Sequence, residues 1–285
     1  MKWILGLDLG PDSEGAVRTA AWLSAKTQPP ARQRIVGVHV VPATPRVDVR
    51  DDEVDAVVAK AEDAARGSVR AGGAERAVDR VDVVFGATPH DQLAAACTYH
   101  HANGILIGRH GPTDEEAFVR LGRVARRLIR ELPAAVMVVP PDYTPPEAAG
   151  PVVVATDLTD DSIAAARFGA SLAADLKTDL LLAHVLRGSE YAFNGTQAQE
   201  PDSDAFASWI EANDLEGART ITQRGDVVNR MLSIGHREQA SVLVCGSRHL
   251  SPMQRVFQAS TGTDLARFAT RPVLIVPPKA ILHVD

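Results

Sequence analysis

The amino-acid sequence contains an internal repeat, and this repeat restricts the fold more than any other feature of the chain. The run WILGLD at residues 3–8 matches VVVATD at residues 152–157, and both runs end in an aspartate. Each copy closes on an apolar run before proline, AAVMVVPP at residues 134–141 and RPVLIVPP at residues 271–278. We therefore expect two related folding units in tandem.

The residues between the two copies are typical of a connection rather than of a helix or strand. The stretch PDYTPPEAAG, residues 141–150, contains three prolines and shows no hydrophobic periodicity. The repeat and this linker predict one domain over residues 1–140 and a second over residues 151–279. The second copy is shorter, chiefly because the first carries the helical segment DDEVDAVVAKAEDAARGSV before its third strand.

Short runs rich in β-branched residues alternate with helical patterns in both copies. The predicted strands span residues 3–8, 35–41, 80–85, 104–108 and 134–139 in the first copy, and 151–156, 179–185, 218–223, 241–245 and 272–276 in the second. Such apolar runs are typical of strands buried on both faces of a parallel sheet, joined by right-handed helical crossovers. Each copy is therefore predicted to form a Rossmann-like α/β fold, with an open five-stranded parallel sheet flanked by helices. Ligands of such sheets bind beyond the carboxyl ends of the strands, where the strand order reverses.

The first strand raises a specific question, because ILGLDLGPDSEGAV at residues 4–17 has the strand, acid and glycine turn of a kinase phosphate loop. In such kinases the loop lies within a strand hairpin, whereas AVRTAAWLSA, which follows here, has the apolar spacing of a helix. The second copy, ATDLTDDSIAAARFG, keeps the aspartate and the helix but lacks the glycines. Asp8 and Asp157 are therefore candidates either for ligand contact or for a turn or capping role.

Composition excludes several classes of function. Hydrophobic residues make up 45% of the 285-residue chain, charged residues make up 23%, and the net charge is −6. This balance argues against nucleic acid as a partner, because phosphate backbones attract a basic surface. No apolar run reaches the roughly 20 residues of a membrane helix, and MKWILGLDLG lacks the pattern of a signal peptide. Cys97 and Cys245 show no metal-ligand spacing, so we expect a cytoplasmic protein in a reducing compartment.

A second polar loop follows the fourth predicted strand of each copy, with the sequences LIGRHG in the first and VCGSRH in the second. Together with the repeat and the terminal strand before proline, this loop resembles that of the universal stress protein family, as a tandem of two domains over nearly the whole chain. The resemblance implies an adenine nucleotide alpha hydrolase-like fold. ATP-binding members carry the pattern G-x-x-G-x9-G-(S/T), whose glycines admit phosphate to backbone N–H groups and whose end opens an anion-favouring helix.

The two copies match this pattern in different places. In the first copy Gly108 and Gly111 fit the first two glycines. Gly122 then follows after ten residues rather than nine, and Arg123 stands at the hydroxyl position. The second copy keeps the spacing and the hydroxyls but has lost two glycines. Its candidate phosphate-site residues are Gly246, Arg248, His249, Ala259, Ser260 and Thr261. The side chains of Arg123 and His249 could contact phosphate directly in place of backbone N–H groups.

The resemblance also implies contacts to the adenine and ribose of ATP, with Mg²⁺ as an accompanying ion. In the family the aspartate after the first strand lies near these groups, and the matching residues are Asp8 and Asp157. The valine after the second-strand histidine supplies backbone contacts to adenine, and the matching residues are Val40 and Val185.

The residues offer little support for catalysis. The sequence contains no G-x-S-x-G elbow, and no Walker lysine follows the glycines. His39 and His184 sit inside apolar strands without partners at metal-ligand spacing, so we interpret them as satisfied core residues rather than ligands. The resemblance to the universal stress protein family implies at most slow ATP hydrolysis.

The resemblance predicts a stress-response or signalling protein that binds an adenine nucleotide, with the second copy as the better ATP site because it retains the spacing. It also predicts an internal pseudo-dimer in which the terminal strands pair, and it leaves a homodimer as a further assembly. Two alternatives stay open. One is a nucleotide-free interaction scaffold with degenerate motifs, and the other is an enzyme that acts on adenylates.

Overall fold

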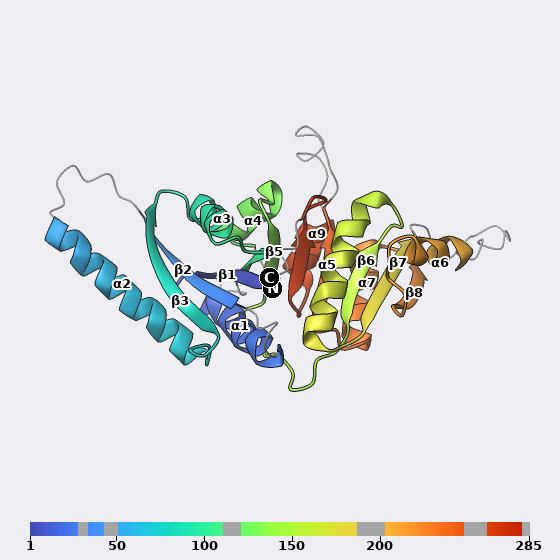
Figure 1. Cartoon of the computed structure of the whole chain (residues 1–285), viewed down its shortest axis with the longest axis horizontal. Helices are drawn as coiled ribbons and strands as arrows, with labels where there is room; N and C mark the ends of the chain where they lie inside the picture. The colour runs from blue at the N-terminus through green and yellow to red at the C-terminus, as the bar shows by residue number, and fades with distance from the viewer. Residues whose placement is uncertain (28–33, 43–50, 111–120, 187–202, 248–260, 281–285) are drawn as a thin grey trace. The chain divides into compact units, whose positions relative to one another are not determined.

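The chain folds into two compact units, an N-terminal unit over Met1–Pro145 and a C-terminal unit over Pro146–Ala280 (Figure 1). The structure is a computed structural model, and it describes residues 1–27, 34–42, 51–110, 121–186, 203–247 and 261–280. Among the helices in these ranges, none has the length and apolar character needed to cross a membrane.

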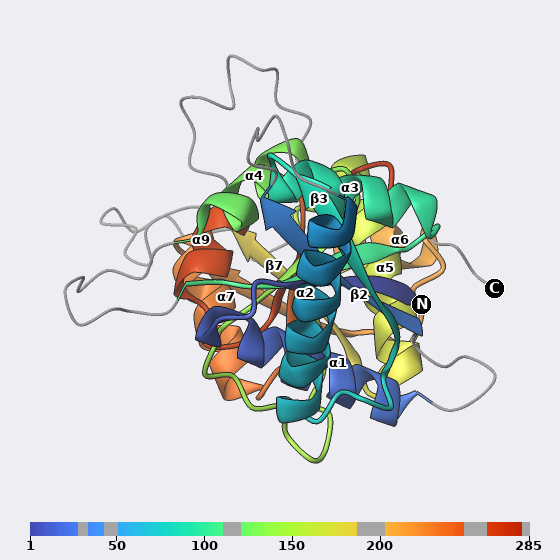
Figure 2. The ribbon, with the colours of Figure 1, turned by 90° about the vertical axis from the view of Figure 1, so that its left-hand side faces the viewer.

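The described residues of the N-terminal unit form a parallel sheet in the order β3-β2-β1-β4-β5. The strands are β1 (Lys2–Leu7), β2 (Arg34–Pro42), β3 (Val78–Gly86), β4 (Gly104–Gly108) and β5 (Ala135–Val139). The helices are the 3-10 turn η1 (Pro11–Ser13), α1 (Glu14–Lys26), α2 (Asp51–Ala71), α3 (Pro89–Tyr99) and α4 (Arg123–Glu131). Figure 2 shows this unit with the long helix α2 in front of the sheet.

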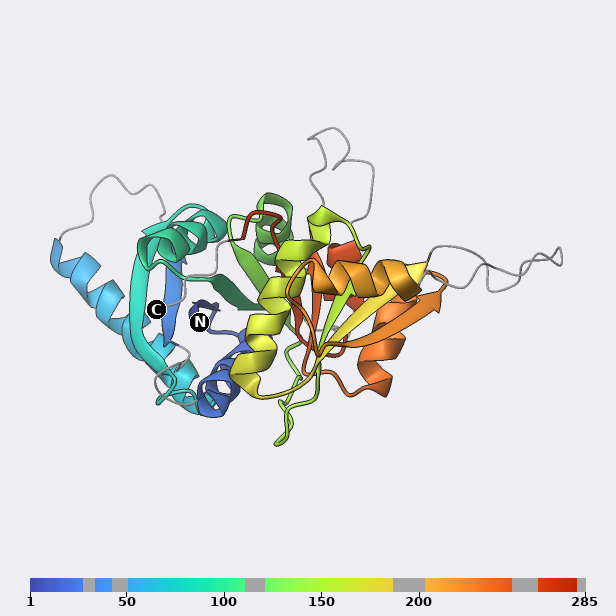
Figure 3. The ribbon, with the colours of Figure 1, turned by 45° about the vertical axis from the view of Figure 1, so that its right-hand side comes forward.

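The C-terminal unit repeats this arrangement, with a parallel sheet in the order β10-β9-β6-β7-β8. The strands are β6 (Val152–Thr156), β7 (Leu180–Leu186), β8 (Arg219–Arg224), β9 (Val242–Gly246) and β10 (Val273–Val276). The helices are α5 (Asp160–Leu176), α6 (Ser203–Glu211), α7 (Val227–Arg237) and α9 (Thr261–Phe268). Figure 3 brings α5 and α6 to the front. Strand β6 therefore takes the place of β1, and the repeat in the sequence is a repeat of the whole fold.

Burial explains why these runs form strands. Every residue of β5 and of β10 is buried, and the other central strands are buried along most of their length. Uninterrupted Val, Ile and Leu suit a sheet covered by helices on both faces. Large side chains such as Trp3 on β1 and Phe168 on α5 are fully buried in the two cores. The predicted α/β fold with two open parallel sheets is confirmed.

The connections place a topological switch point in each sheet. In the N-terminal unit the chain steps outward from β1 to β3 and then returns to β4 and β5. Right-handed crossovers therefore put α1 and α2 on one face, and α3 and α4 on the other. Accordingly, α1 contacts α2, and α3 contacts α4. The N-terminal switch point lies at the carboxyl ends of β1 and β4, and the C-terminal switch point lies at those of β6 and β9.

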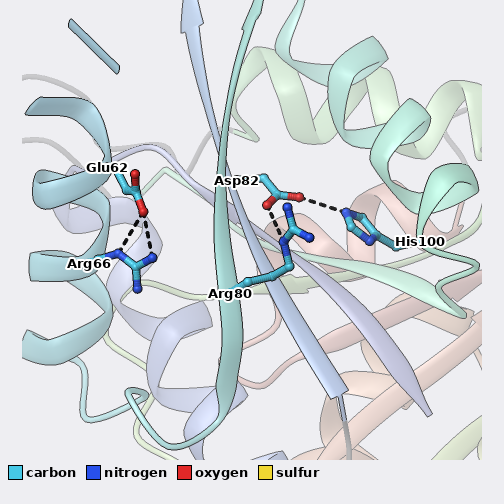
Figure 4. Close-up of polar contacts among 5 residues, drawn as sticks. All are labelled: Glu62, Arg66, Arg80, Asp82 and His100. Atoms are coloured by element: carbon cyan, nitrogen blue, oxygen red, sulfur yellow. Dashed lines mark hydrogen bonds and ion pairs between the residues drawn. The ribbon is translucent and has the colours of Figure 1, made fainter. Parts of the chain in front are cut away.

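The outermost strand of the N-terminal sheet, β3, begins at Val78, two residues before the predicted start. The strand was predicted to start too far along the chain because exposed Asp79 and Arg80 interrupt the apolar pattern. The pairing with β2 already starts at Val78. Asp82 accepts a hydrogen bond from Arg80 Nε at 2.6 Å and lies 2.9 Å from His100 Nε2 (Figure 4). These charges discourage pairing of the strand with another chain, and they tie the end of α3 to β3.

The segment after β5 is held against helix α1. Arg18 donates a hydrogen bond from Nε to the Tyr143 carbonyl oxygen at 3.1 Å and another from Nη2 to the Pro141 carbonyl oxygen. A Cβ atom at Gly15 would lie 1.9 Å from the Pro140 carbonyl oxygen, so the absence of a side chain there permits this contact. The first residues of the predicted linker therefore pack on the N-terminal unit.

Candidate functional site

Strand register brings three predicted site residues to the N-terminal switch point. Strands β1 and β2 are paired up to Leu7 and His39, so Asp8 and Val40 follow side by side. Strand β1 is also paired with β4, whose last residue is Gly108. The parallel sheet thus presents Asp8, Val40 and Gly108 at one edge, where ligands of open α/β sheets bind.

The C-terminal switch point has the same construction. Thr156 pairs with His184, so Asp157 and Val185 follow side by side at the carboxyl ends of β6 and β7. Strand β9, which pairs with the other side of β6, ends at Gly246. The sequence repeat therefore produces two spatially equivalent candidate sites.

The two aspartates shape the turn that leaves the first strand of each copy. Asp8 Oδ1 accepts the Gly10 N–H at 2.9 Å, and Asp157 Oδ1 accepts the N–H and the hydroxyl of Thr159 at 3.2 and 2.6 Å. The leucine after each aspartate has a positive φ, 62° in the first copy and 61° in the second. A bulky residue in this conformation is strained. The turn role considered for both aspartates is present, and the same strained geometry occurs at both switch points.

The two strand histidines are satisfied by the backbone. His39 Nδ1 lies 2.8 Å from the Leu7 carbonyl oxygen, and His184 Nδ1 lies 2.9 Å from the Thr156 carbonyl oxygen. A carbonyl oxygen only accepts, so Nδ1 carries the proton in both rings. These bonds bridge the first two strands of each unit just before Val40 and Val185. Both rings are half-buried at the ends of their strands, so they are held by the backbone as expected but lie at the margin of the core.

The glycines that end β4 and β9 have a packing role of their own. A Cβ atom at Gly108 would lie 1.8 Å from the carbonyl oxygen of Asp12 in η1. At Gly246 the nearest atom would be the carbonyl oxygen of Asp161 at the start of α5, at 3.1 Å. Both glycines therefore allow the helical start after the first strand to approach the fourth strand. At Gly108 the packing requires a glycine whether or not a phosphate is bound.

The N-terminal switch point contains an acid–imidazole contact that the sequence did not single out, formed by Asp12 of η1 and His110 of the loop after β4. The Asp12 carboxylate contacts His110 Nδ1. The imidazole lies over Gly122, where a Cβ atom would be 2.8 Å from His110 Nε2. The sequence repeat could have revealed this pair, because the matching positions of the second copy again carry an acid and a base, Asp161 and Arg248.

Two helices follow the candidate phosphate loops, α4 in the N-terminal unit and α9 in the C-terminal unit. Helix α4 begins at Arg123, whose side chain is exposed, and Gly122 precedes it without a side-chain hydrogen bond to the first turn. Helix α9 begins at Thr261. The remaining phosphate-site candidates lie outside the residues that the structure describes: Gly111, Arg248, His249, Ala259 and Ser260.

The residue between Gly108 and His110 is a buried arginine. Arg109 donates its backbone N–H to the Val139 carbonyl oxygen at 3.0 Å. Burial lowers the pKa of its guanidinium, and the charge of Asp142 partly offsets this effect. The loop after β4 is thereby connected to the segment after β5.

One group of possible metal ligands occurs among the described residues. His90, Asp91 and Glu131 place one ligand atom each within 4.8 Å of one another. Arg127 and Arg130 lie 3.6 and 3.9 Å from Glu131, and their positive charges disfavour a cation there. We assign no metal to this group.

Two open sheets of identical strand order, each with its switch point between the first and fourth strands, define a tandem of doubly wound α/β domains. The chain belongs to the universal stress protein family, whose family model matches residues 1–140 and again residues 149–277. It is thus a tandem two-domain universal stress protein.

Solved structures share this architecture over nearly the whole chain. A universal stress protein from Archaeoglobus fulgidus DSM 4304 is 18% identical, with a TM-score of 0.72 over 97% of this chain and 98% of that one. A protein of unknown function from Pseudomonas aeruginosa PAO1, PA1789, is 15% identical, with a TM-score of 0.65 over 97% and 92%. At these identities the likeness concerns the fold alone. No curated protein matches the chain.

Proposed function

We propose that this universal stress protein binds an adenine nucleotide at its switch points, and that the C-terminal switch point is the better site for ATP with Mg²⁺. Nucleotide occupancy would then serve a stress-response or signalling role. The observation that carries the proposal is the register that sets an aspartate, a valine backbone and a glycine on three adjacent strand ends in both units.

The chemistry of these groups suits an adenine nucleotide. Backbone groups at Val40 and Val185 follow the last paired residues of β1 with β2 and of β6 with β7, and such groups can read the edge of a purine. Carboxylates at Asp8 and Asp157 can accept hydrogen bonds from ribose hydroxyls. A helix that begins beyond the fourth strand favours an anion at its N-terminus.

Two features favour the C-terminal unit for the phosphates. In the second copy the candidate hydroxyls of Ser260 and Thr261 follow the motif spacing, and Thr261 lies on helix α9. In the N-terminal unit the corresponding start carries Arg123, and the Asp12 carboxylate already lies near that end through His110.

The repeat supplies a matched pair of variants that tests the proposal. Asp157→Asn keeps an oxygen for the Thr159 turn but removes the carboxylate charge, so we expect ATP affinity to fall about tenfold without loss of folding. Asp8→Asn makes the same change in the N-terminal unit and should alter ATP affinity less than twofold. Isothermal titration calorimetry with Mg·ATP measures both. The proposal fails if the folded wild-type protein binds no ATP, ADP or AMP at millimolar concentration.

The nucleotide-free scaffold keeps one specific observation in its favour. Gly108 is explained by packing against the carbonyl oxygen of Asp12, so its presence does not depend on phosphate. Mass spectrometry of small molecules released from the purified protein separates the two functions. A partner captured equally with and without added nucleotide would favour the scaffold.

A further inference from the structure

Helix α4, which lies beside α3 in the N-terminal unit (Figure 1), carries a row of exposed arginines. The buried side of this helix is formed by Ala125, Leu128 and Ile129. Arginines stand at the first helical position and three, four and seven positions after it, so they share the opposite side. We call these four exposed residues the arginine face: Arg123, Arg126, Arg127 and Arg130.

The acid of the same helix lies at one end of the arginine face. Glu131 Oε1 is 3.6 Å from Arg127 Nη1 and 3.9 Å from Arg130 Nη2, and such exposed pairs hold weakly in water. Toward the helix start, Arg123 and Arg126 form no ion pair with any residue in the described part of the chain. Because guanidinium groups stay charged at every physiological pH, these two are available to an external anion.

The equivalent helix of the C-terminal unit shows that the fold does not require this charge. Helix α9 buries Gly262, Leu265 and Ala266 at the same spacing at which α4 buries its three residues. With the helices matched in this way, the positions of the last three arginines carry a hydroxyl, an acid and one arginine: Thr263, Asp264 and Arg267. The two helices therefore share an inner side, whereas the outer side is strongly positive only in α4.

The arginines also act against the helix that carries them. Like charges three or four positions apart repel each other, as Arg123 does with Arg126 and Arg127. Arg123 in addition stands at the positive end of the helix dipole, where acids are favoured, and the first turn of α4 contains no acid. Helix α9 instead has Asp264 in its first turn. Binding of a partner explains such a row of charges better than folding does.

We propose that the arginine face of α4 is a docking surface for a short acidic segment of a partner protein. This inference goes beyond the proposed function, and it does not require a bound nucleotide. Guanidinium groups can bind carboxylates through two parallel hydrogen bonds. Nine helical residues span about 13 Å, which equals about four residues of an extended chain.

Nucleic acid fits this surface less well than an acidic peptide does. The whole chain has a net charge of −6 although α4 alone contributes four arginines against one glutamate. A long polyanion would therefore meet repulsion beyond the helix, whereas a short segment meets only the arginine face. Helix α4 also contains no aromatic residue on which a base could stack.

Fluorescence anisotropy of a labelled oligoglutamate peptide, titrated with the full chain, tests the proposal. Arg126→Gln with Arg127→Gln removes two charges from the middle of the face, and Arg126→Lys with Arg127→Lys keeps the charges but not the guanidinium groups. Lys60→Gln with Arg66→Gln, on α2, is the matched control because it removes two exposed positive charges from another helix of the same unit. Arg123 stays unchanged because it is also a candidate phosphate contact.

We expect the glutamine variant of α4 to weaken peptide binding at least about tenfold, the lysine variant about threefold, and the α2 control less than about twofold. Added salt should weaken binding to the wild-type protein more than binding to the glutamine variant. The urea midpoint of the glutamine variant should equal or exceed that of the wild type, because repulsion within α4 is reduced.

Four results would overturn the inference. The first is a wild-type protein that does not bind the peptide at millimolar concentration, and the second is an equal loss of binding in the α2 control. The third is a lower urea midpoint of the glutamine variant, which would mean that the arginines serve the fold. The fourth is a single-stranded oligonucleotide of the same charge that binds the wild-type protein more tightly than the peptide does.

Discussion

Replacing Gly108 with alanine is expected to destabilise the N-terminal unit by about 3 kcal/mol, because the new methyl group has no room. Its Cβ atom would lie 1.8 Å from the Asp12 carbonyl oxygen and 3.0 Å from the Ser13 Cα. These are backbone atoms, so a side-chain rotation cannot relieve the overlap and η1 must move away from β4. Urea unfolding followed by circular dichroism gives the change in the free energy of unfolding.

The equivalent change in the second copy provides the control. At Gly246 the nearest atom to a Cβ would be the Asp161 carbonyl oxygen at 3.1 Å, which a small shift can accommodate, so Gly246→Ala should cost about 1 kcal/mol or less. Gly67→Ala, on α2 with nothing within 4 Å, should be neutral or stabilise by about 0.5–1 kcal/mol. Equal losses for Gly108→Ala and Gly246→Ala would contradict this account of the packing.

The two cysteines are expected to react with a thiol reagent at least about a hundredfold more slowly in the folded protein at pH 8 than in urea. Cys97 lies in the N-terminal unit and Cys245 in the C-terminal unit, and both are buried. Burial raises the pKa of Cys97 from 9.0 to about 11 and that of Cys245 from 9.0 to about 12. The reactive thiolate is therefore scarce at pH 8, and access to it is blocked as well.

The same shifts determine the pH dependence of stability. A folded-state pKa above the unfolded value means that the folded protein holds the thiol proton more tightly. The contribution of the two buried thiols to the free energy of unfolding is therefore complete below about pH 9, and it is lost as the pH rises through about 11 to 12. Urea midpoints at pH 8, 9 and 10 should fall with rising pH, and Cys97→Ala with Cys245→Ala should reduce this fall.

The labelling rate of each cysteine reports on the stability of its own unit, so it shows whether Gly108→Ala destabilises the N-terminal unit alone. Gly108→Ala should speed labelling of Cys97 while leaving that of Cys245 near the wild-type rate. Peptide mapping after a timed pulse of reagent measures both. If both cysteines were labelled faster by the same factor, the two units would unfold together and the local account of Gly108 would be wrong.

The strands and helices could be predicted from local sequence patterns, because the central strands are continuous apolar runs. The strand predicted over residues 104–108 is β4, and the fold class follows from its alternation with helices. The start of β3 was less visible, because Asp79 and Arg80 lie on the exposed part of an outer strand. Pairing with β2 extends that strand beyond its apolar pattern.

The candidate site could be predicted less completely. The sequence placed Asp8, Val40 and Gly108 at strand ends, and register then put them on one edge of the sheet. The contact of Asp12 with His110 joins residues that are 98 positions apart, and no periodicity connects them. The sequence motif suggested that Gly108 is a glycine in order to admit phosphate. A motif shows that a residue is small, but it does not show which neighbouring atoms leave no room for a side chain.

The carbonyl contacts of Arg18 decide where the two halves of this chain can be separated as modules. A fragment that ends at residue 140 follows the repeat, but it removes the Pro141 and Tyr143 carbonyl oxygens that accept from the guanidinium. A fragment that ends at Pro145 keeps both acceptors. Any exchange of halves between relatives should therefore carry this short extension with the N-terminal module, because the hydrogen-bonded boundary lies beyond the boundary of the duplication.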